Sequence, residues 1–265
     1  MKRLLITGAA GGLGSVMRTR LAHLADTLRL SDMSDMGEAA ANEEIVQCDL
    51  GDAQAVEALV EGCDGIVHFG GKSTEGPWSV INNANIQGVM NLYEAARKHG
   101  MPRILFASSN HAIGFYPQSQ VIDNTVYPRP DGLYGISKVF GEAVANAYHD
   151  KFGQETAIVR IGSSFPEPAN HRMLSTWLSY DDFVRMIERI FDVPKLGCPI
   201  IYGASANSAS FWDNSKVDWL GWRPQDNSEQ FRAQIDATTP KPAPDAADVL
   251  YQGGLFCTDG IHSED

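Results

Sequence analysis

The sequence lacks long hydrophobic runs and an excess of basic residues, and each absence excludes a class of protein. No apolar run reaches the roughly 18 residues that a membrane-spanning helix needs. The 265 residues include 33 acidic and 21 basic side chains, which give a formal charge of −12. That charge would repel nucleic-acid phosphates and anionic lipid surfaces. We therefore expect neither nucleic acid nor a membrane as a partner.

Cysteine is scarce, and the cysteines are scattered. Cys48, Cys63, Cys198 and Cys257 form no C-x-x-C pair, and no histidine cluster has the spacing of zinc ligands. We expect reduced thiols and no metal, with Cys48 and Cys63 packed as structural thiols, although a catalytic cysteine stays open. The chain also has no signal-peptide cleavage pattern before its first strand-like segment, which favours a cytoplasmic location.

Short apolar segments instead alternate with amphipathic ones. Apolar residues make up 43% of the chain and charged residues 20%, as in globular proteins with a large core. Strands this short and apolar are buried on both faces, so we expect an α/β Rossmann fold, a doubly wound parallel sheet with helices on both faces. The predicted strands span 3–7, 28–31, 44–48, 65–69, 103–107, 156–161 and 199–202, and the predicted helices span 12–25, 53–61, 79–99, 133–152 and 180–191.

Glycines follow the first strand at a regular spacing. Gly8, Gly11 and Gly14 stand at the turn into the first helix, together with Gly12 and Leu13. Glycines at such a turn let a pyrophosphate approach the helix N-terminus, where backbone N–H groups favour anions. The spacing predicts a dinucleotide site, although a glycine-rich turn can also serve only to pack a helix on a strand.

Two carboxylates end the second and third strands. Asp32 lies 24 residues after Gly8, near the position of the acidic group that binds the adenosine ribose of NAD and repels the 2′-phosphate of NADP. We therefore expect NAD as the cofactor. The alternative is that Asp32 caps the following turn. Asp49, which precedes Leu50, could face the adenine edge or cap the next helix.

Tyr134 and Lys138 stand four residues apart on a predicted helix and share one of its faces. A tyrosine titrates near about 10, so as a base it needs a cation that favours the phenolate, and Lys138 supplies one. Ser109 ends a strand at the carboxyl edge of the sheet, where it can hold the reacting oxygen. An exposed Tyr–Lys pair and a turn-forming serine are the ordinary alternatives. The nucleotide-binding half that precedes them favours catalysis.

These features together resemble the extended-type short-chain dehydrogenase/reductase family, from residue 1 to about residue 224. The resemblance implies that Ser109, Tyr134 and Lys138 form the catalytic set and that Asn85 supports the lysine through a water. It rests on TGAAGGLG at 7–14, Asp32, DL at 49–50, HFGG at 68–71, NIQG at 85–88, Ser109, Y-x-x-x-K at 134–138 and RIGSSFP at 160–166.

Further runs, among them SSNH from Ser108, HRM from His171 and YQGG from Tyr251, resemble the family members that oxidise hexuronic acids. This resemblance implies that glucuronate or galacturonate is oxidised at C1 to an aldaric acid lactone. Either acid would place its C1 hydroxyl between Ser109 and Tyr134. The implied substrate contacts are Arg172 for the carboxylate and Ser73, Asn110, His111 and Ser163 for the hydroxyls. By themselves, these residues could equally be a surface ion-pair arginine and polar loop residues.

His111 could be mistaken for a general base, because an unperturbed histidine titrates near neutrality. We assign it to binding instead. The resemblance places the base at Tyr134, and no acidic residue lies near enough to His111 in the sequence to suggest a His–Asp pair.

After residue 161 the alternation loosens. We predict one domain over residues 1–265, with an NAD-binding core at about 1–160, a small C-terminal substrate-binding lobe at about 161–238 and an extended arm at 239–265. Ser179 is expected to cap the helix at 180–191, with Asp182 in the capping-box position. The Pro-rich segment 239–247 cannot form a regular element, and the arm should pack on its own chain or on a neighbour.

Two other functions remain open. An epimerase or dehydratase that keeps its NAD bound would use the same Tyr–Lys pair. A non-catalytic NAD-binding regulatory module would use the fold alone. The expected partners are a small sugar acid and further copies of the chain in a homo-oligomer.

Overall fold

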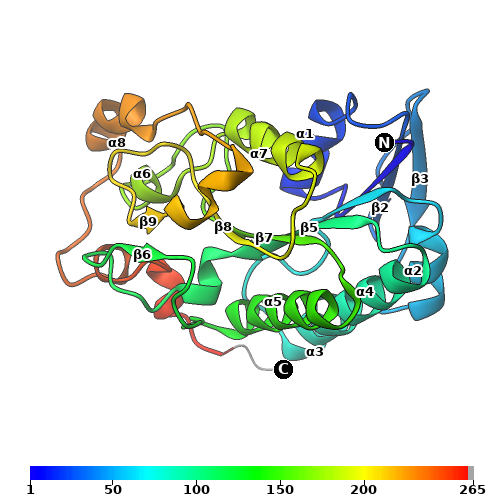
Figure 1. Cartoon of the computed structure of the whole chain (residues 1–265). Coiled ribbons are helices and arrows are strands. Elements are labelled where there is room, and N and C mark those ends of the chain that lie inside the picture. The colour runs from blue at the N-terminus through cyan, green and yellow to red at the C-terminus, as the bar shows by residue number, and fades with distance from the viewer. Residues whose placement is uncertain (262–265) are drawn as a thin grey trace.

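A seven-stranded parallel sheet runs through the centre of the computed structural model, which describes residues 1–261 (Figure 1). Its order is β3-β2-β1-β4-β5-β7-β8. The chain therefore winds outward from β1 in one direction, returns, and winds outward from β4 in the other, which confirms the doubly wound Rossmann topology. The strands are β1 (Arg3–Thr7), β2 (Thr27–Asp32), β3 (Glu43–Gln47), β4 (Gly65–His68), β5 (Arg103–Ser109), β7 (Thr156–Ile161) and β8 (Ile200–Gly203).

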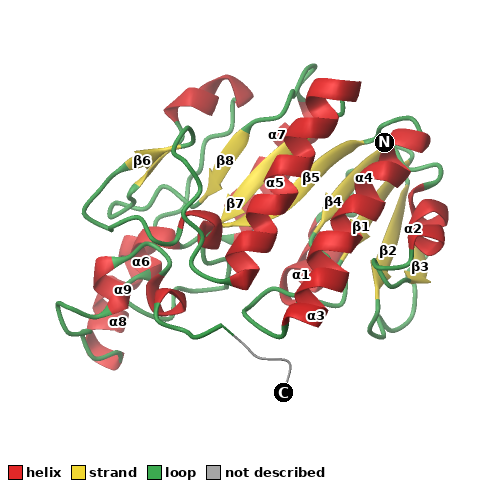
Figure 2. Ribbon diagram, turned by 90° about the horizontal axis from the view of Figure 1, so that it is seen from below, coloured by secondary structure: helices red, strands yellow, loops and turns green. Residues whose placement is uncertain are grey.

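Helices cover both faces of this sheet (Figure 2). One face carries α2 (Ala53–Val60), α4 (Gly88–Lys98) and α5 (Leu133–Phe152), and the other carries α1 (Gly12–Arg20) and α7 (Tyr180–Asp192). Successive side chains of β1 alternate between the two faces, as a strand requires. Leu4 and Ile6 pack toward α1 and α7, while Leu5 packs toward α2 and α4. Burying each such side chain contributes about 1.5–3 kcal/mol.

Three predicted elements differ from the structure. The helix predicted at 79–99 is a composite of α3 (Trp78–Ile81), a π-helical segment at Asn82–Gln87 and α4. The helix predicted at 12–25 ends at Arg20, because the chain must turn back so that Thr27 can begin β2 beside β1. The strand β3 is half-buried rather than buried on both faces, since it lies at the edge of the sheet.

The part of the chain beyond β7 adds a small lobe to the β8 side of the sheet (Figure 1).

Ser179 caps α7 by accepting from the Asp182 backbone N–H, as predicted. The capping box is wrong, however, because the Asp182 carboxylate accepts from the backbone N–H groups of Gln225 and Asp226 instead. The remaining elements are β6 (Ile122–Asp123), which pairs with β9 (Trp212–Asp213), α6 (Met173–Thr176), α8 (Arg232–Thr238), α9 (Ala247–Leu250) and 3-10 turns at Asn110–Ile113, Ser215–Leu220, Ser228–Phe231 and Gly254–Cys257.

The C-terminal arm packs on its own chain, which decides between the two alternatives for the described part of the arm. The side chain of Gln252 donates to the carbonyls of Pro117 and Gln120 and accepts from the Trp212 indole N–H. The segment that follows Thr238 is irregular, as predicted, until α9 begins at Ala247. The arm was predicted to end at residue 265, and its last four residues lie outside the described ones.

A buried ion pair joins α5 to the sheet. Glu142 of α5 accepts two hydrogen bonds from Arg160 of β7, at 2.9 and 2.7 Å. It accepts a third from the Ser108 hydroxyl of β5, at 2.6 Å. The Arg160 and Glu142 side chains are only 1% and 5% exposed. In such surroundings a lost partner leaves an uncompensated charge, so this pair holds α5 at a defined height over β5 and β7.

Candidate active site

The carboxyl ends of the strands surround one cavity of about 730 Å³. It lies where the strand order reverses between β1 and β4, the position at which open α/β sheets bind their ligands. The predicted catalytic, cofactor-binding and substrate-binding residues all line this cavity: Gly8, Gly11, Gly12, Leu13, Gly14, Asp32, Asp49, Leu50, Ser73, Ser109, Asn110, His111, Tyr134, Lys138, Ser163 and Arg172.

The glycine turn after β1 allows close backbone packing and also leaves space for a ligand at the N-terminus of α1. Gly8 has a φ of +70°, and a Cβ there would lie 2.7 Å from the Phe69 carbonyl carbon. A Cβ on Gly14 would collide with the Gly8 carbonyl oxygen, whereas a Cβ on Gly12 would meet nothing within 4 Å. Gly8 and Gly14 are therefore required by the backbone packing, and Gly12 leaves room at the N-terminus of α1. That N-terminus has no side-chain cap, so its N–H groups are available to an anion.

The two strand-end carboxylates have different local roles. Asp32 lines the cavity and also accepts from the backbone N–H groups of Ala10 and Ser34, both at 3.0 Å. Asp32 thus organises the next turn, as the alternative expects, and it also faces the cavity, while its contact with a ribose stays a prediction. Asp49 does not cap α2, because Asp52 does so by accepting from the first N–H groups of that helix. Asp49 lines the cavity instead.

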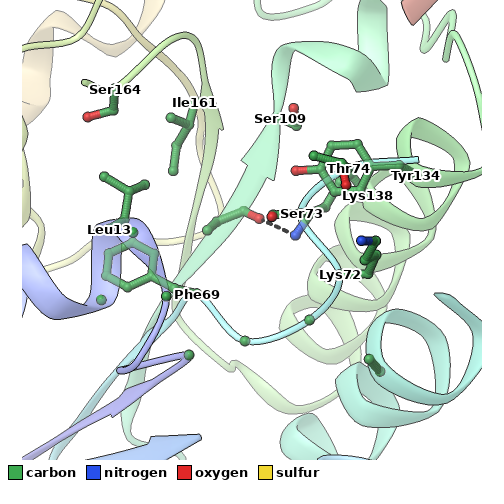
Figure 3. Close-up of a pocket in the computed structure, with 18 of the residues that line it drawn as sticks. Leu13, Phe69, Lys72, Ser73, Thr74, Ser109, Tyr134, Lys138, Ile161 and Ser164 are labelled. Carbon is green, nitrogen blue, oxygen red and sulfur yellow. Dashed lines mark hydrogen bonds between the residues drawn. The ribbon is translucent and has the colours of Figure 1, made fainter. Parts of the chain in front are cut away.

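Ser109, Tyr134 and Lys138 gather at one wall of the cavity (Figure 3). The backbone N–H of Tyr134, in the first turn of α5, donates to the buried carboxylate of Glu75 at 2.6 Å. The Lys138 ammonium donates to the Ala107 carbonyl at 2.8 Å, the dashed line in Figure 3. It also lies 5.4 Å from the centre of the Tyr134 ring. The ends of β5 and the first turns of α5 therefore place the three residues together.

Burial governs the protonation of this group. It raises the pKa of Tyr134 to about 12, although a hydrogen bond with Ser109 acts in the opposite direction. Burial also lowers the pKa of Lys138 to about 8. In this geometry the Lys138 ammonium is held by the Ala107 carbonyl, and its expected lowering of the tyrosine pKa stays a prediction.

Arg172 is not a surface residue. Its side chain is 11% exposed and donates to the Gln252 carbonyl at 2.8 Å, while its Nε lies 3.9 Å from Asp248. Burial lowers the pKa of the guanidinium, and the charges of Asp248 and Asp131 oppose that shift. The interpretation of Arg172 as a surface ion pair is therefore wrong, and a buried cation faces the cavity.

His111 has a carboxylate partner, contrary to the expectation from the sequence. Its Nδ1 lies 2.7 Å from the Asp131 carboxylate, 20 residues away. The loop after β5 and the segment before α5 run side by side, because Asp131 donates its backbone N–H to the His111 carbonyl and Arg129 donates to the Ala112 carbonyl. Sequence distance is therefore a poor guide here, since backbone pairing between two loops brings the residues together.

Three other contributors to the site were not predicted. Phe256 of the arm lines the cavity and stacks on His111 with ring centres 3.9 Å apart. Gln252 lies in the YQGG run and accepts from Arg172, and only that unusual run could have drawn attention to it. Glu75 follows Ser73 by two residues, and its burial against α5 has no sequence signal. Asn85 was named from the resemblance: it accepts from the Lys72 N–H, donates to the Lys72 carbonyl and donates to Ser137, while its support of Lys138 through a water stays a prediction.

Across residues 1–261, no group of three or more His, Cys, Asp or Glu side chains is arranged to hold a metal ion. The four cysteines are unpaired. Burial raises the pKa of the Cys48 and Cys63 thiols, as it does for packed thiols. Over the same residues, no helix is long and apolar enough to cross a membrane.

Residues 4–182 match the NAD dependent epimerase/dehydratase family. A uronate dehydrogenase from Agrobacterium fabrum is 61% identical over the whole of both chains. One from Pseudomonas putida is 56% identical, over 97% of this chain and 96% of that one. The solved structure of a mutant uronate dehydrogenase from Agrobacterium tumefaciens, complexed with NAD, superposes with a TM-score of 0.99 at 61% identity and covers both chains fully.

The glycine turn gives a matched pair of variants. Gly14→Ala should lower the melting temperature of the unliganded protein, because overpacking costs about 1–3 kcal/mol. Gly12→Ala should leave the melting temperature unchanged but weaken NAD binding about tenfold, because the methyl group enters the space before α1. Thermal unfolding and NAD titration measure the two effects. Unchanged NAD affinity in Gly12→Ala would contradict the placement of the cofactor at this turn.

Proposed function

Because the chain belongs to the NAD dependent epimerase/dehydratase family, we propose that it oxidises the hexuronic acid glucuronate or galacturonate at C1. Its high sequence identity with uronate dehydrogenases shows that it is an NAD-dependent oxidoreductase. The substrate loses a hydride from C1 to NAD and a proton from the C1 hydroxyl, and the product is the aldaric acid lactone. The observation that carries this proposal is the single cavity that joins the glycine turn, Tyr134 and a buried Arg172.

The cofactor end of the cavity fits NAD. The uncapped N-terminus of α1 and the open space beside Gly12 suit the pyrophosphate, and the Asp32 carboxylate suits the ribose hydroxyls while repelling a 2′-phosphate. Asp49 and Leu50 would border the adenine. When bound, NAD accepts the hydride, and its positively charged ring favours a phenolate nearby. Residues 1–160 thus hold mainly the cofactor.

The reactive wall supplies the proton chemistry. Tyr134 removes the proton of the C1 hydroxyl, and Ser109 holds the same oxygen in reach of the phenol. Because burial raises the Tyr134 pKa to about 12, the phenolate forms only where positive charge offsets the burial. The Lys138 ammonium lies 5.4 Å from the centre of the ring, and it contributes this charge while it stays protonated.

The substrate end is formed by polar and cationic side chains. One nitrogen of the Arg172 guanidinium, Nη2, has no partner among residues 1–261. It pairs with the substrate carboxylate, because a guanidinium suits planar oxyanions. The sugar hydroxyls contact Ser73, Asn110, His111 and Ser163. Residues 161–238 and the arm beyond them complete this end. The cytoplasmic location and the homo-oligomer expected from the sequence remain predictions.

The direct test follows NADH absorbance with purified protein, NAD and either acid. We expect net NADH formation that falls about a hundredfold or more in Tyr134→Phe, the usual range for loss of a general base. The exposed Tyr127→Phe serves as the control and should keep full activity. An epimerase that retains its NAD, or a regulatory module, would form no net NADH from either acid. That outcome would overturn the proposal.

Lys138→Met tests how the base is activated. The wild-type kcat/KM should rise with pH, because Tyr134 reacts only when deprotonated. In Lys138→Met the rise should shift to higher pH, since a cation that favours the phenolate is gone. The difference should shrink above about pH 8, where Lys138 itself loses its proton. Lys151→Met, an exposed lysine on the same helix, is the control. Superimposable profiles would contradict this role for Lys138.

A further inference from the structure

We propose that Asp131 is a positioning residue that holds the His111 ring in one orientation and one tautomer. In this arrangement His111 Nδ1–H donates to Asp131, and Nε2 faces the cavity as a hydrogen-bond acceptor. The inference rests on the proposed function in one respect, because the group that donates to Nε2 is assigned as a hydroxyl of the sugar acid.

The surroundings of the His111 ring allow one orientation. Nδ1 lies 2.7 Å from the Asp131 carboxylate, Phe256 stacks on one face at 3.9 Å, and the Tyr134 ring packs at 61° with centres 5.7 Å apart. A half-turn of the imidazole would put a carbon where Nδ1 is and would lose the bond to Asp131. Nε2 has no partner among residues 1–261, and His111 lines the cavity.

Close packing around Asp131 keeps its carboxylate beside the His111 ring. The side chain is fully buried, at 0% exposure. Gly114 and Gly253 pack so closely that a Cβ on either would collide with the carboxylate. Gly253 belongs to the C-terminal arm, which also supplies Phe256. The arm therefore packs against both the Asp131 carboxylate and one face of the His111 ring, so the arm forms part of the site.

The chemistry of the pair sets the tautomer. A carboxylate only accepts hydrogen bonds, so Nδ1 must carry the proton. In a neutral imidazole, the other nitrogen is then an acceptor. The other acceptors in the predicted substrate end belong to groups that can also donate, namely the hydroxyls of Ser73 and Ser163 and the amide of Asn110, whose nitrogen donates. Fixed in this way, His111 accepts from a hydroxyl and cannot donate to it.

The test is a double-mutant cycle on KM. Asp131→Ala should raise KM for the uronate about threefold to tenfold, the effect of one lost hydrogen bond, with kcat little changed. In a His111→Ala background, Asp131→Ala should raise KM by a clearly smaller factor, because only the charge effect of Asp131 on Arg172 remains. Asp182→Ala, which removes another fully buried carboxylate in α7, is the control for general destabilisation and should leave KM unchanged. An equal rise in KM in both backgrounds would overturn the proposal.

A second measurement needs neither activity nor the Asp131 variant. Nitrogen-15 NMR of the wild-type histidines at about pH 8, where an unperturbed imidazole is neutral, reports which ring nitrogen carries the proton. His111→Ala identifies the signal among the seven histidines. We expect a protonated Nδ1 and a bare Nε2, and the opposite tautomer would overturn the proposal. If the wild-type protein formed no NADH with either acid, the proposed function would fail while this measurement still tested Asp131.

Discussion

The parallel sheet is the constraint on which the site depends. Because all seven strands point the same way, their carboxyl ends meet at one edge, and residues as distant in sequence as Gly8, Ser109 and Ser163 line one cavity. The reversal of strand order between β1 and β4 separates the flanking helices there and leaves room for ligands. The buried Glu142–Arg160 pair then fixes α5, and with it Tyr134, against the same edge.

Burial has opposite effects on the two central titratable groups. It raises the pKa of Tyr134 to about 12 and lowers that of Lys138 to about 8, so each equilibrium is shifted toward the neutral form, although Lys138 still carries its charge at neutral pH. Under the proposed function, Tyr134 is activated jointly by the charge that arrives with its ligands and by the charge of Lys138. A low-dielectric wall strengthens each of these interactions. The geometry therefore links proton removal to an assembled complex rather than to a permanently ionised tyrosine.

Patterns with a strong local cause were predictable from the sequence. The helix α5 begins and ends at the predicted residues, 133 and 152, because a glycine stands just outside each end of a long amphipathic run. The glycine turn and the strand-end carboxylates followed from spacing alone. The His111–Asp131 pair and the position of Phe256 did not, since pairing between loops and the return of the arm leave no periodic signal. The π-helical segment around Asn85 was not predictable for a different reason, because its sequence is that of an ordinary helix.

The central claim is that C1 of the sugar acid delivers its hydride directly to NAD inside this cavity. The most direct measurement is the mass of the reduced cofactor formed from glucuronate or galacturonate carrying deuterium at C1. The account predicts that the deuterium appears in the NADH. Unlabelled NADH, or a sugar altered without any reduced cofactor, would contradict it.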